Sequence, residues 1–595
     1  MTLDASGLTT AEQESEKTLR SILMALEDRV NFKLEAGAGA GKTHSLIETL
    51  DHILGDRSKY LPRDGQRVAC ITYTNVARNE IIRRTDSSPH VFAETIHGFL
   101  WEAISRFKKS LLCEIETLPG FVRLLEDRDQ ASLQNHNVSY DLGFRGIDEH
   151  TVRLHHEDVP LLAARLFTKP KFRRLVADRF PIVLIDEYQD TPAGLAEAML
   201  GEQPDSTSES TYGFFGDHWQ QIYDKTCGSI DHLSVKSIQK RANWRSSQAV
   251  VALLNNMRPE LPQATVSDAI SGTVTVYHTN SWTGSRGTHS KKGQIPDQAL
   301  KETLQWVSED ALRRHGKGAN GTPKILMLTH SSIAAELGFG SIDRAFKRNE
   351  DFVRKADDVV AFLLDFLEPC CEFFSKKQYG PMLDLLKRSR PRLKRRSDKT
   401  GWTDLFDEIN LARTAGSVGD VLDVLLGQEY FALPQAVVRR QRRWEAALRD
   451  LEAEQELSEP RRLVEYGKFR TVAYREVMAL REYVDENTPF STQHGVKGAE
   501  YSNVIGVFGG GWTQYNFPDM LAKFRQRDTL TDSEKRRFER SRNLFYVACS
   551  RARENLVLLF TTELSDDAMK TLKEWVGESD VIDVQYSADG VPSEA

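Results

Sequence analysis

The sequence predicts an α/β protein with two doubly wound parallel-sheet cores, each carrying a mainly helical insertion. Short apolar stretches alternate with helical stretches over residues 28–110, and the same alternation resumes at residue 272. Long, mainly helical stretches interrupt both regions. Strands that alternate with helices favour parallel sheets, because each crossover is long enough to hold a helix. A chain of 595 residues also exceeds what a single hydrophobic core supports.

The first core begins with strands predicted at NFKLEA (31–36), RVACITYTN (67–75) and VFAETIHGFLWEAI (91–104), the last running into a helix. A mostly helical stretch follows before the apolar run Ile182 to Ile185, which suits a strand buried on both faces. We therefore expect the first core at residues 1–98 and 180–268, with its insertion at 99–179.

The second core begins with GTVTVYHT (272–279) and KILMLTHS (324–331), separated by a predicted helix. It resumes at FSTQHGVKGAEYSNVIGVF (490–508) and ends with NLFYVACSRARENLVLLF (543–560). We expect this core at residues 269–337 and 488–595, with a second helical insertion at 338–487.

Composition narrows the class of protein. Lys and Arg number 79 against 86 Asp and Glu, a net charge of −7, so nucleic-acid contacts must come from local basic patches. The six cysteines show no C-x-x-C pairs, and the polar, acidic N-terminus is unlike a signal peptide. No uncharged apolar stretch is long enough to span a bilayer. We expect a cytoplasmic protein without a membrane partner.

Residues 36–43 read AGAGAGKT, a glycine-rich turn of the kind whose backbone N–H groups cradle phosphates. Lys42 is expected to reach the β- and γ-phosphates of ATP, and Thr43 to bind Mg²⁺. The general pattern starts with glycine where this chain has Ala36. The ATP-binding prediction covers Ala36, Gly37, Ala38, Gly39, Ala40, Gly41, Lys42, Thr43 and His44.

About 140 residues later the chain reads IVLIDEYQDT, with Asp186 and Glu187 at the end of the apolar run. Ligands of parallel α/β sheets bind at the carboxyl ends of strands, so these carboxylates belong beside the phosphate loop. We expect Asp186 to hold Mg²⁺ and Glu187 to polarise the attacking water. A generic P-loop kinase or GTPase does not account for this DEYQD segment together with the arginines described below.

Eight motifs in order make the chain resemble a UvrD/Rep/PcrA-type superfamily 1A DNA helicase. They are AGAGAGKT, ITYTNVARNEI, ETIHGF, LIDEYQDT, GDHWQQIY, NWRSSQ, STQHGVKGAEY and YVACSRA. The resemblance implies two RecA-like cores with ATP between them, and ATP-dependent 3′ to 5′ movement on single-stranded DNA with duplex unwinding. The implied partners are single-stranded DNA and junctions between single and double strands.

The resemblance also implies roles for residues around ATP. Arg245 and Arg551 match the two arginines that stabilise charge on the γ-phosphate, and Gln220 matches the glutamine that senses it. Trp244 falls where the family stacks an aromatic ring on adenine. Glu500 matches the acidic residue near the ribose, and Gln13 is our candidate for an adenine-reading glutamine.

On the DNA side, matched positions supply short polar groups and aromatic rings, which bind phosphates and stack on bases. The predicted DNA-binding residues are Thr72, Tyr73, Asn75, Thr95, His97, Trp219, Tyr223, Thr492 and His494. A basic run at residues 387–399 and an arginine cluster at 439–443 in the second insertion offer further phosphate contacts, or simply a solvated surface.

One departure from the family opens a second interpretation. Where the family continues its glutamine motif as IYGWRGA, this chain reads IYDKTCG, with Lys225 at the position of a base-stacking tryptophan. Trp219 and Tyr223 are the nearby aromatic residues that could stack on a base in its place. The alternative function is a DNA-sensing regulatory ATPase that controls a separate nuclease subunit with little unwinding of its own, by analogy with the helicase-like component of Gabija-type systems.

Overall fold

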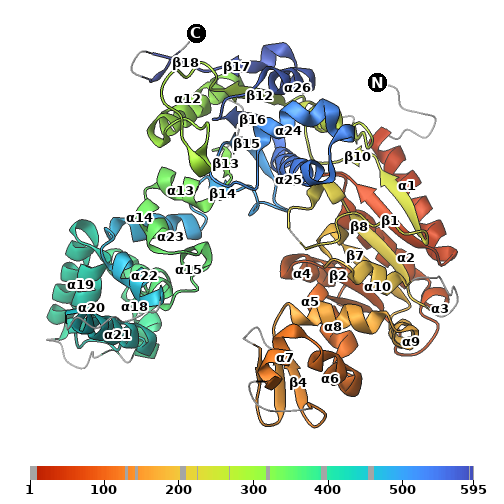
Figure 1. The fold of residues 1–595 in the computed structure, drawn as a ribbon, viewed down its shortest axis with the longest axis horizontal. Coiled ribbons are helices and arrows are strands. Elements are labelled where there is room, and N and C mark those ends of the chain that lie inside the picture. Colours follow the sequence, from red (N-terminus) through yellow and green to blue (C-terminus); the bar gives the residue numbers. More distant parts are fainter. Residues whose placement is uncertain are drawn as a thin grey trace.

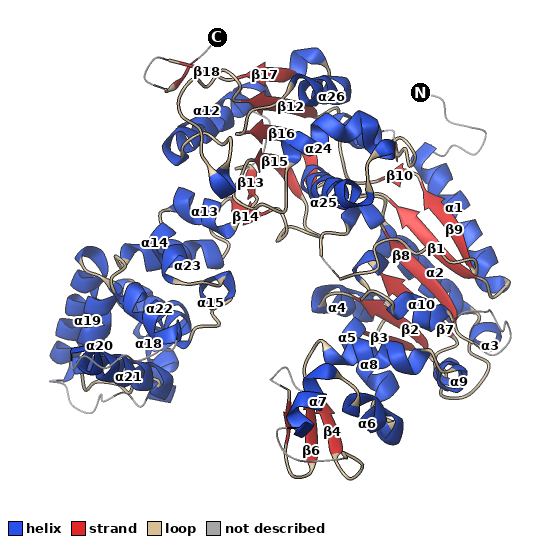
Figure 2. Cartoon of the chain, in the orientation of Figure 1, coloured by secondary structure: helices blue, strands red, loops and turns tan. Residues whose placement is uncertain are grey.

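The computed structural model describes residues 10–126, 132–140, 145–201, 209–223, 225–266, 268–315, 322–389, 391, 398–452, 461–587 and 590–593. Two six-stranded sheets lie in two adjoining cores, and a helical lobe extends from each core (Figures 1 and 2). The predicted fold class, two parallel α/β cores with mainly helical insertions, is confirmed. No helix in the described part of the chain combines the length and apolar character that crossing a bilayer requires.

The first sheet has the strand order β3-β2-β7-β8-β1-β9, and every neighbouring pair is parallel. Its strands are β1 (Asn31–Ala36), β2 (Val68–Thr72), β3 (Val91–Thr95), β7 (Ile182–Asp186), β8 (Thr211–Gly216) and β9 (Val235–Lys240). All residues of β2 and β7 are buried. Because both faces of these strands are covered by helices, their sequences are continuous apolar runs instead of alternating patterns.

Helices and short elements complete the first core. They are α1 (Thr10–Glu27), α2 (Lys42–Gly55), α3 (Arg57–Tyr60), α4 (Asn75–Arg84), α10 (Leu195–Leu200), α11 (Gln248–Met257), the 3-10 turns η1 (Tyr188–Asp190) and η2 (His218–Gln220), and the strand pair β10 (Ala242–Asn243) and β11 (Ala264–Thr265). Helix α4 begins at a Thr74 cap whose hydroxyl accepts the Ala77 amide. Strand β2 therefore passes directly into a helix, which places residues 72–75 at its carboxyl end.

The first insertion contains helices and, at the end far from the core, a small sheet with the order β4-β6-β5 (Figure 2). Its elements are α5 (Ile96–Ile104), α6 (Lys108–Glu116), α7 (Pro119–Glu126), β4 (Asn137–Tyr140), β5 (Gly146–Ile147), β6 (Thr151–Leu154), α8 (Asp158–Phe167) and α9 (Pro170–Arg179). One apolar cluster joins this insertion to the β2 and β7 side of the first sheet. The insertion is thus anchored on the core that carries the phosphate loop.

The second sheet has the order β14-β13-β15-β16-β12-β17 and is also parallel throughout. Its strands are β12 (Thr273–His278), β13 (Lys324–Met327), β14 (Phe490–Thr492), β15 (Tyr501–Phe508), β16 (Ala552–Phe560) and β17 (Val581–Asp583). The remaining elements are α12 (Asp297–His315), α24 (Phe517–Lys523), α25 (Asp532–Cys549), α26 (Asp566–Val576) and the antiparallel pair β18 (Gln585–Tyr586) and β19 (Pro592–Ser593). The carboxyl end of α25 lies at the boundary with the first core.

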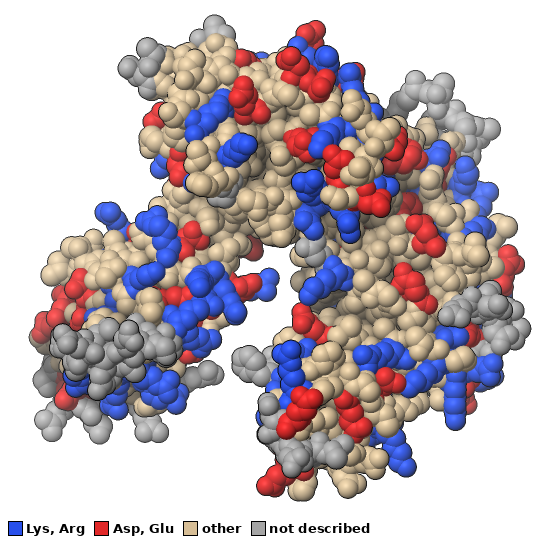
Figure 3. All heavy atoms as spheres, viewed as in Figure 1, with Lys and Arg blue, Asp and Glu red and all other residues tan. Residues whose placement is uncertain are grey.

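The second insertion is helical in its described residues. It contains α13 (His330–Leu337), α14 (Gly340–Ala345), α15 (Asn349–Val353), α16 (Asp358–Phe362), a π-helical turn (Leu363–Leu367), α17 (Glu368–Ser375), α18 (Tyr379–Leu386), α19 (Asp398–Ala415), α20 (Val418–Gly427), α21 (Gln435–Glu452), α22 (Arg461–Arg470) and α23 (Arg475–Val484). Most of the predicted basic run 387–399 lies outside the described residues. Figure 3 shows an open channel between this lobe and the first core, with Lys and Arg side chains on both of its sides.

Candidate nucleotide and DNA site

The phosphate loop joins the carboxyl end of β1 to the first residue of α2. Gly39 and Gly41 have φ angles of 76° and 75°, in the left-handed region that side chains disfavour. A Cβ atom on Gly39 would also lie 2.8 Å from Oδ1 of Asn243. Ala36 is a buried residue of strand β1, so the departure from the general pattern falls outside the turn itself. The turn therefore keeps the backbone that phosphate binding needs.

A cavity of about 600 Å³ lies beside the phosphate loop. It is lined by Glu12, Ser15, Glu16, Leu19, Gly41, His44, Glu48 and Trp244. The Trp244 ring is 45% exposed, its Nε1 donates to Oγ of Ser15 at 3.2 Å, and its backbone N–H donates to the Gly39 carbonyl. Trp244 and His44 thus both line a cavity that opens beside the phosphate loop. Gln13 lies on α1 but is not among the described residues that line the cavity, so its predicted role rests on the motif resemblance alone.

Two carboxylates lie at the carboxyl end of strand β7, where Asp186 is the last residue of the strand and Glu187 follows it. Asp186 is 7% exposed, and burial together with Glu187 raises the pKa of its carboxyl to about 7, with Lys42 opposing the shift. Burial alone would raise the pKa of Glu187, but Lys42 and Lys497 hold it below its ordinary value. Lys42 therefore lies within electrostatic reach of both carboxyl groups, which brings the two predicted halves of the ATP site together.

The residues present fit a magnesium ion. A hydroxyl from Thr43 and a carboxylate from Asp186 are oxygen donors of the kind Mg²⁺ prefers. The buried Asp186 carboxyl beside a second carboxylate also lacks a full countercharge, as its raised pKa indicates. Thr43 and Asp186 would hold the ion, whose charge would offset that of the phosphate oxygens.

Gln220 is buried on η2, where its Nε2 donates to Oδ2 of Asp217 at 2.8 Å. Lys497 of the second core reaches the same turn. Its Nζ donates to the Gln220 carbonyl at 2.7 Å and forms an ion pair with Asp190. A residue of the second core thus holds the two first-core loops that follow strands β7 and β8.

The two predicted arginines lie at the boundary between the cores. Arg551 is 1% exposed, and its guanidinium donates to the carbonyls of Val547 and Ala499 and to Oγ of Ser550. Arg245 forms an ion pair with Glu500, with Nε 2.6 Å from Oε2. Burial first, and then Arg245, lower the pKa of Arg551 to about 10. Arg551 is therefore charged at neutral pH and lies within electrostatic reach of Arg245.

Residues 243–247 bridge the phosphate loop and the second core. Asn243 Nδ2 donates to the Ala38 carbonyl, while Ser246 Oγ donates to the Ala552 carbonyl at the start of β16. The N–H of Ser247 donates to the Arg553 carbonyl at 2.7 Å. The Ala38 amide itself donates to the hydroxyl of Tyr546 on α25 at 3.2 Å. A shift of one core relative to the other would therefore reach the phosphate loop directly.

Two exposed aromatic rings form the clearest candidate for a base-stacking surface. Tyr73, after β2, and Tyr223, after η2, stack with ring centroids 6.0 Å apart at 18°, and they are 43% and 38% exposed. Lys497 Nζ lies 5.4 Å from the Tyr223 ring centroid. An exposed lysine, Lys225, follows with a φ of 65°. Bases can stack on such a pair, and a nearby cation attracts the phosphates.

The other predicted polar residues lie on separate elements of the two cores and the first insertion. Asn75 is exposed at the start of α4, and Thr95 caps α5 by accepting the Gly98 amide. His97 stacks on His156 of the first insertion, with ring centroids 3.5 Å apart. His494 of the second core accepts or donates a hydrogen bond with the Tyr515 hydroxyl at 2.8 Å. Asn75, Thr95, His97 and His494 remain predicted DNA contacts.

Three predicted DNA contacts have buried side chains in this arrangement of the cores. Thr72 is 1% exposed and its hydroxyl donates to the Thr74 carbonyl, while Thr492 is 7% exposed and its hydroxyl accepts the Gly495 amide. Trp219 is 3% exposed because its indole packs against Tyr546 and under the Arg542 guanidinium. The DNA-binding roles of these three residues stay predictions, and Tyr223 is an exposed ring that can replace the missing tryptophan.

Sequence reasoning missed two residues. Trp512 follows β15, is 39% exposed and packs on the His494 ring with centroids 5.3 Å apart, so it adds an aromatic surface on the second core. A tryptophan after three glycines was the available signal.

The second missed residue is Lys240. It is 1% exposed at the end of β9, and its Nζ donates to Oγ of Ser45 at 2.7 Å, directly behind the phosphate loop. Burial lowers its pKa to about 8.

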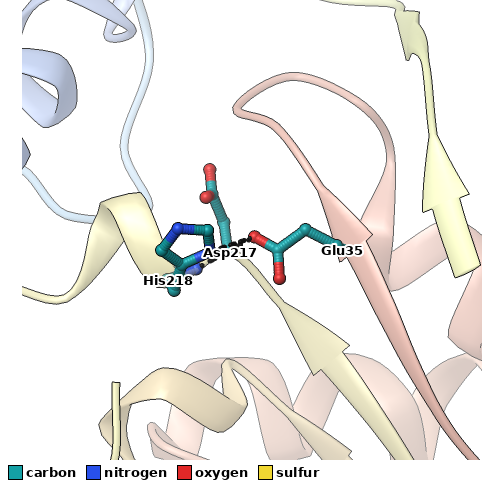
Figure 4. Close-up of side chains that lie close together, drawn as sticks. All are labelled: Glu35, Asp217 and His218. Atoms are coloured by element: carbon teal, nitrogen blue, oxygen red, sulfur yellow. Dashed lines mark hydrogen bonds and ion pairs between the residues drawn. The ribbon is translucent and has the colours of Figure 1, made fainter. Parts of the chain in front are cut away.

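Glu35, Asp217 and His218 meet at the carboxyl ends of β1 and β8, close enough to suggest a metal site (Figure 4). Arg258 provides the positive charge instead. Its guanidinium lies 2.9 Å from Glu35 and 2.6 Å from Asp217, and it is 2% exposed. Burial would raise the pKa of Glu35, but His218 and Arg258 hold it below its ordinary value. We assign the cluster a structural role.

The fold and the site together define a P-loop nucleotide-binding protein whose site lies between two parallel α/β cores. Comparison with known proteins refines this. Residues 20–226 match the family described as AAA domain, and residues 438–563 match the UvrD-like helicase C-terminal domain. These two matches, one in each half of the chain, support a UvrD-like helicase of superfamily 1. It is also similar to the Gabija protein GajB of Bacillus cereus (strain HuB5-5), at 23% identity over 95% of this chain and 98% of that protein.

Proposed function

We propose that this helicase-family ATPase moves along single-stranded DNA in the 3′ to 5′ direction and uses ATP hydrolysis to separate duplexes. The observation that supports this most directly is the convergence of both cores on one site. The phosphate loop and the β7 carboxylates come from the first core, and Arg551, Glu500 and Lys497 come from the second. Hydrolysis that requires groups from both cores couples the chemical step to their relative movement.

In this proposal Lys42 and the loop amides bind the phosphates of ATP, with Mg²⁺ supplying further positive charge when bound. Glu187 orients and deprotonates the attacking water, and Arg245 and Arg551 stabilise the charge that develops on the γ-phosphate. Lys497 would transmit this event, because it contacts the Asp190 loop, the Gln220 carbonyl and the Tyr223 ring. The ATP site and the proposed base-stacking surface thus share one cation.

A second candidate is a DNA-sensing regulatory ATPase that controls a partner nuclease, as one component of a Gabija-type system. Lys225 supports it, because a lysine replaces the ring on which the wider family stacks a base. The similarity to GajB along nearly the whole chain also supports it. Stacked Tyr73 and Tyr223 favour the translocase, because they restore an aromatic surface beside the lost position.

The test is ATP hydrolysis with and without single-stranded DNA, followed by displacement of duplexes carrying a 3′ or a 5′ tail. If the protein is a translocase, DNA should stimulate ATP hydrolysis, and Lys42→Ala should abolish it. The wild type should displace the 3′-tailed duplex and not the 5′-tailed one. Stimulated hydrolysis without displacement at any tail length would favour the regulatory ATPase. Hydrolysis that ignores DNA would contradict both candidates.

A further inference from the structure

The ion pair between Arg245 and Glu500 is the one direct contact between a predicted catalytic arginine and an acidic side chain among the described residues. Nε of Arg245 lies 2.6 Å from Oε2 of Glu500, and the two side chains are 22% and 45% exposed. The Arg245 backbone is fixed by Asn243, whose Oδ1 accepts its N–H at 2.9 Å. The backbone is thus held at the phosphate loop while the guanidinium is held by the second core.

The neighbouring contacts show why a carboxylate is needed there. Arg551 donates to the carbonyl of Ala499, the residue before Glu500, and the Tyr501 N–H donates to the Arg551 carbonyl. Residues 499–501 therefore hold both arginines. The guanidinium of Arg245 lies within electrostatic reach of Arg551, and the Glu500 carboxylate offsets the repulsion between the two cations.

We propose that Glu500 is a positioning residue that sequesters Arg245 in the nucleotide-free protein and releases it only when the phosphates of ATP compete for the guanidinium. The inference rests on the proposed function. A triphosphate carries more negative charge than one carboxylate and offers several oxygens to the planar guanidinium fork. ATP can therefore replace Glu500 as the partner of Arg245, and the broken pair frees the second core to move.

This role differs from a ribose contact, which the motif resemblance implies for the same residue. A residue that binds the ribose strengthens nucleotide binding, so its loss weakens affinity. A residue that competes with the nucleotide for Arg245 weakens binding, so its loss strengthens affinity. The sign of one change in affinity separates the two roles.

The variant Glu500→Gln keeps the size of the side chain and removes its charge. We expect it to bind a non-hydrolysable ATP analogue about two- to fivefold more tightly, the range typical of a partly exposed ion pair. We also expect hydrolysis without DNA to rise, so that the stimulation by DNA falls. Glu563→Gln, which neutralises an exposed carboxylate of the second core, is the matched control and should change neither quantity.

The decisive experiment is a double-mutant cycle by isothermal titration calorimetry with Arg245→Gln, Glu500→Gln and the double variant. The proposal predicts that Glu500→Gln has no effect on affinity when Arg245 is already replaced. It also predicts the same gain for nucleotides with and without the ribose 3′-hydroxyl. Additive effects, or a loss of affinity that disappears with the 3′-deoxy nucleotide, would overturn it. A wild-type protein that binds no ATP would instead contradict the proposed function.

Discussion

Lys497 of the second core forms an ion pair with Asp190 of the first, with Nζ 2.6 Å from Oδ2 and side-chain exposures of 12% and 1%. Burial raises the pKa of Asp190 to about 6, with Lys497 opposing the shift, so the Asp190 carboxyl is mainly ionised at neutral pH. A buried pair of this kind contributes little net stability but is costly to break. Its position indicates that it fixes the two cores in one relative arrangement.

Lys497→Met should lower the free energy of unfolding by about 3 kcal/mol, because it leaves the Asp190 carboxylate buried without a countercharge. It should also reduce the stimulation of ATP hydrolysis by DNA. Thermal unfolding and hydrolysis assays measure the two effects. Adding Asp190→Asn should restore most of the stability, and a double variant as unstable as the single one would show that the pair is not the cause.

Arg551→Ala should lower kcat for ATP hydrolysis by about 10³-fold or more, since an arginine at the γ-phosphate is worth that much in related NTPases. Nucleotide affinity should change far less, because the phosphate loop stays intact. Arg553→Ala is the control, an exposed arginine two residues away. Comparable kcat values for the two variants would place Arg551 outside the reaction.

Trp512→Ala should weaken binding of single-stranded DNA about 5- to 150-fold, the equivalent of one stacked base. Tyr223→Ala should have a similar effect from the first core. Fluorescence anisotropy with a labelled oligonucleotide measures both. Tyr379→Ala removes a ring of the second insertion that is 50% exposed, and its affinity should match the wild type. Unchanged binding in Trp512→Ala would exclude that ring from the DNA path.

Arg258→Met should destabilise the protein by about 3–5 kcal/mol, because Glu35 and Asp217 would remain buried without their shared cation. The unfolding temperature should fall in this variant, and added Zn²⁺ should not raise the unfolding temperature of the wild type. If added metal ions stabilise the wild type and this stabilisation disappears in Glu35→Gln, the cluster in Figure 4 is a metal site after all.

Stability should fall as the pH drops from 6.5 towards 4, in part because of His97. Burial first, and then His156, lower the pKa of His97 to about 4. The unfolded chain binds a proton near pH 6.5 and the folded one does not, so this contribution is complete above 6.5 and lost as the pH falls to 4. Burial and His155 also lower the pKa of His156, and Glu157 opposes this shift. The Nδ1 atom of His156 forms a hydrogen bond with the Tyr140 hydroxyl. His97→Gln should flatten the unfolding temperature across this range, and parallel curves would contradict the assignment.

Much of the fold could be predicted because local sequence determines it. The apolar run Ile182 to Ile185 is a buried strand, and the glycines of the phosphate loop adopt the left-handed backbone that the motif requires. The predicted domain boundaries remain a prediction. The small sheet of the first insertion was missed, since strands of two to four residues have too few positions for an alternating pattern.

The candidate site was harder to predict where it depends on contacts between the cores. Motif spacing places Trp219 beside DNA, but only the structure shows that its ring is covered by Tyr546 and Arg542. The Arg245 and Glu500 pair joins residues 255 positions apart and leaves no local signal. Trp512 was missed because it lies outside the eight motifs.

The parallel order of the second sheet has a consequence during synthesis. Strand β12 ends at His278, but its neighbours β16 and β17 begin only at Ala552 and Val581. At roughly 5–20 residues per second, the ribosome takes roughly 15 s to a minute to cover that interval. The first sheet is complete once β9 has emerged, so a folded first core carries β12 with both edges unpaired until the chain is nearly finished. Nascent or prematurely terminated chains should therefore be a substrate for chaperones that bind exposed strands.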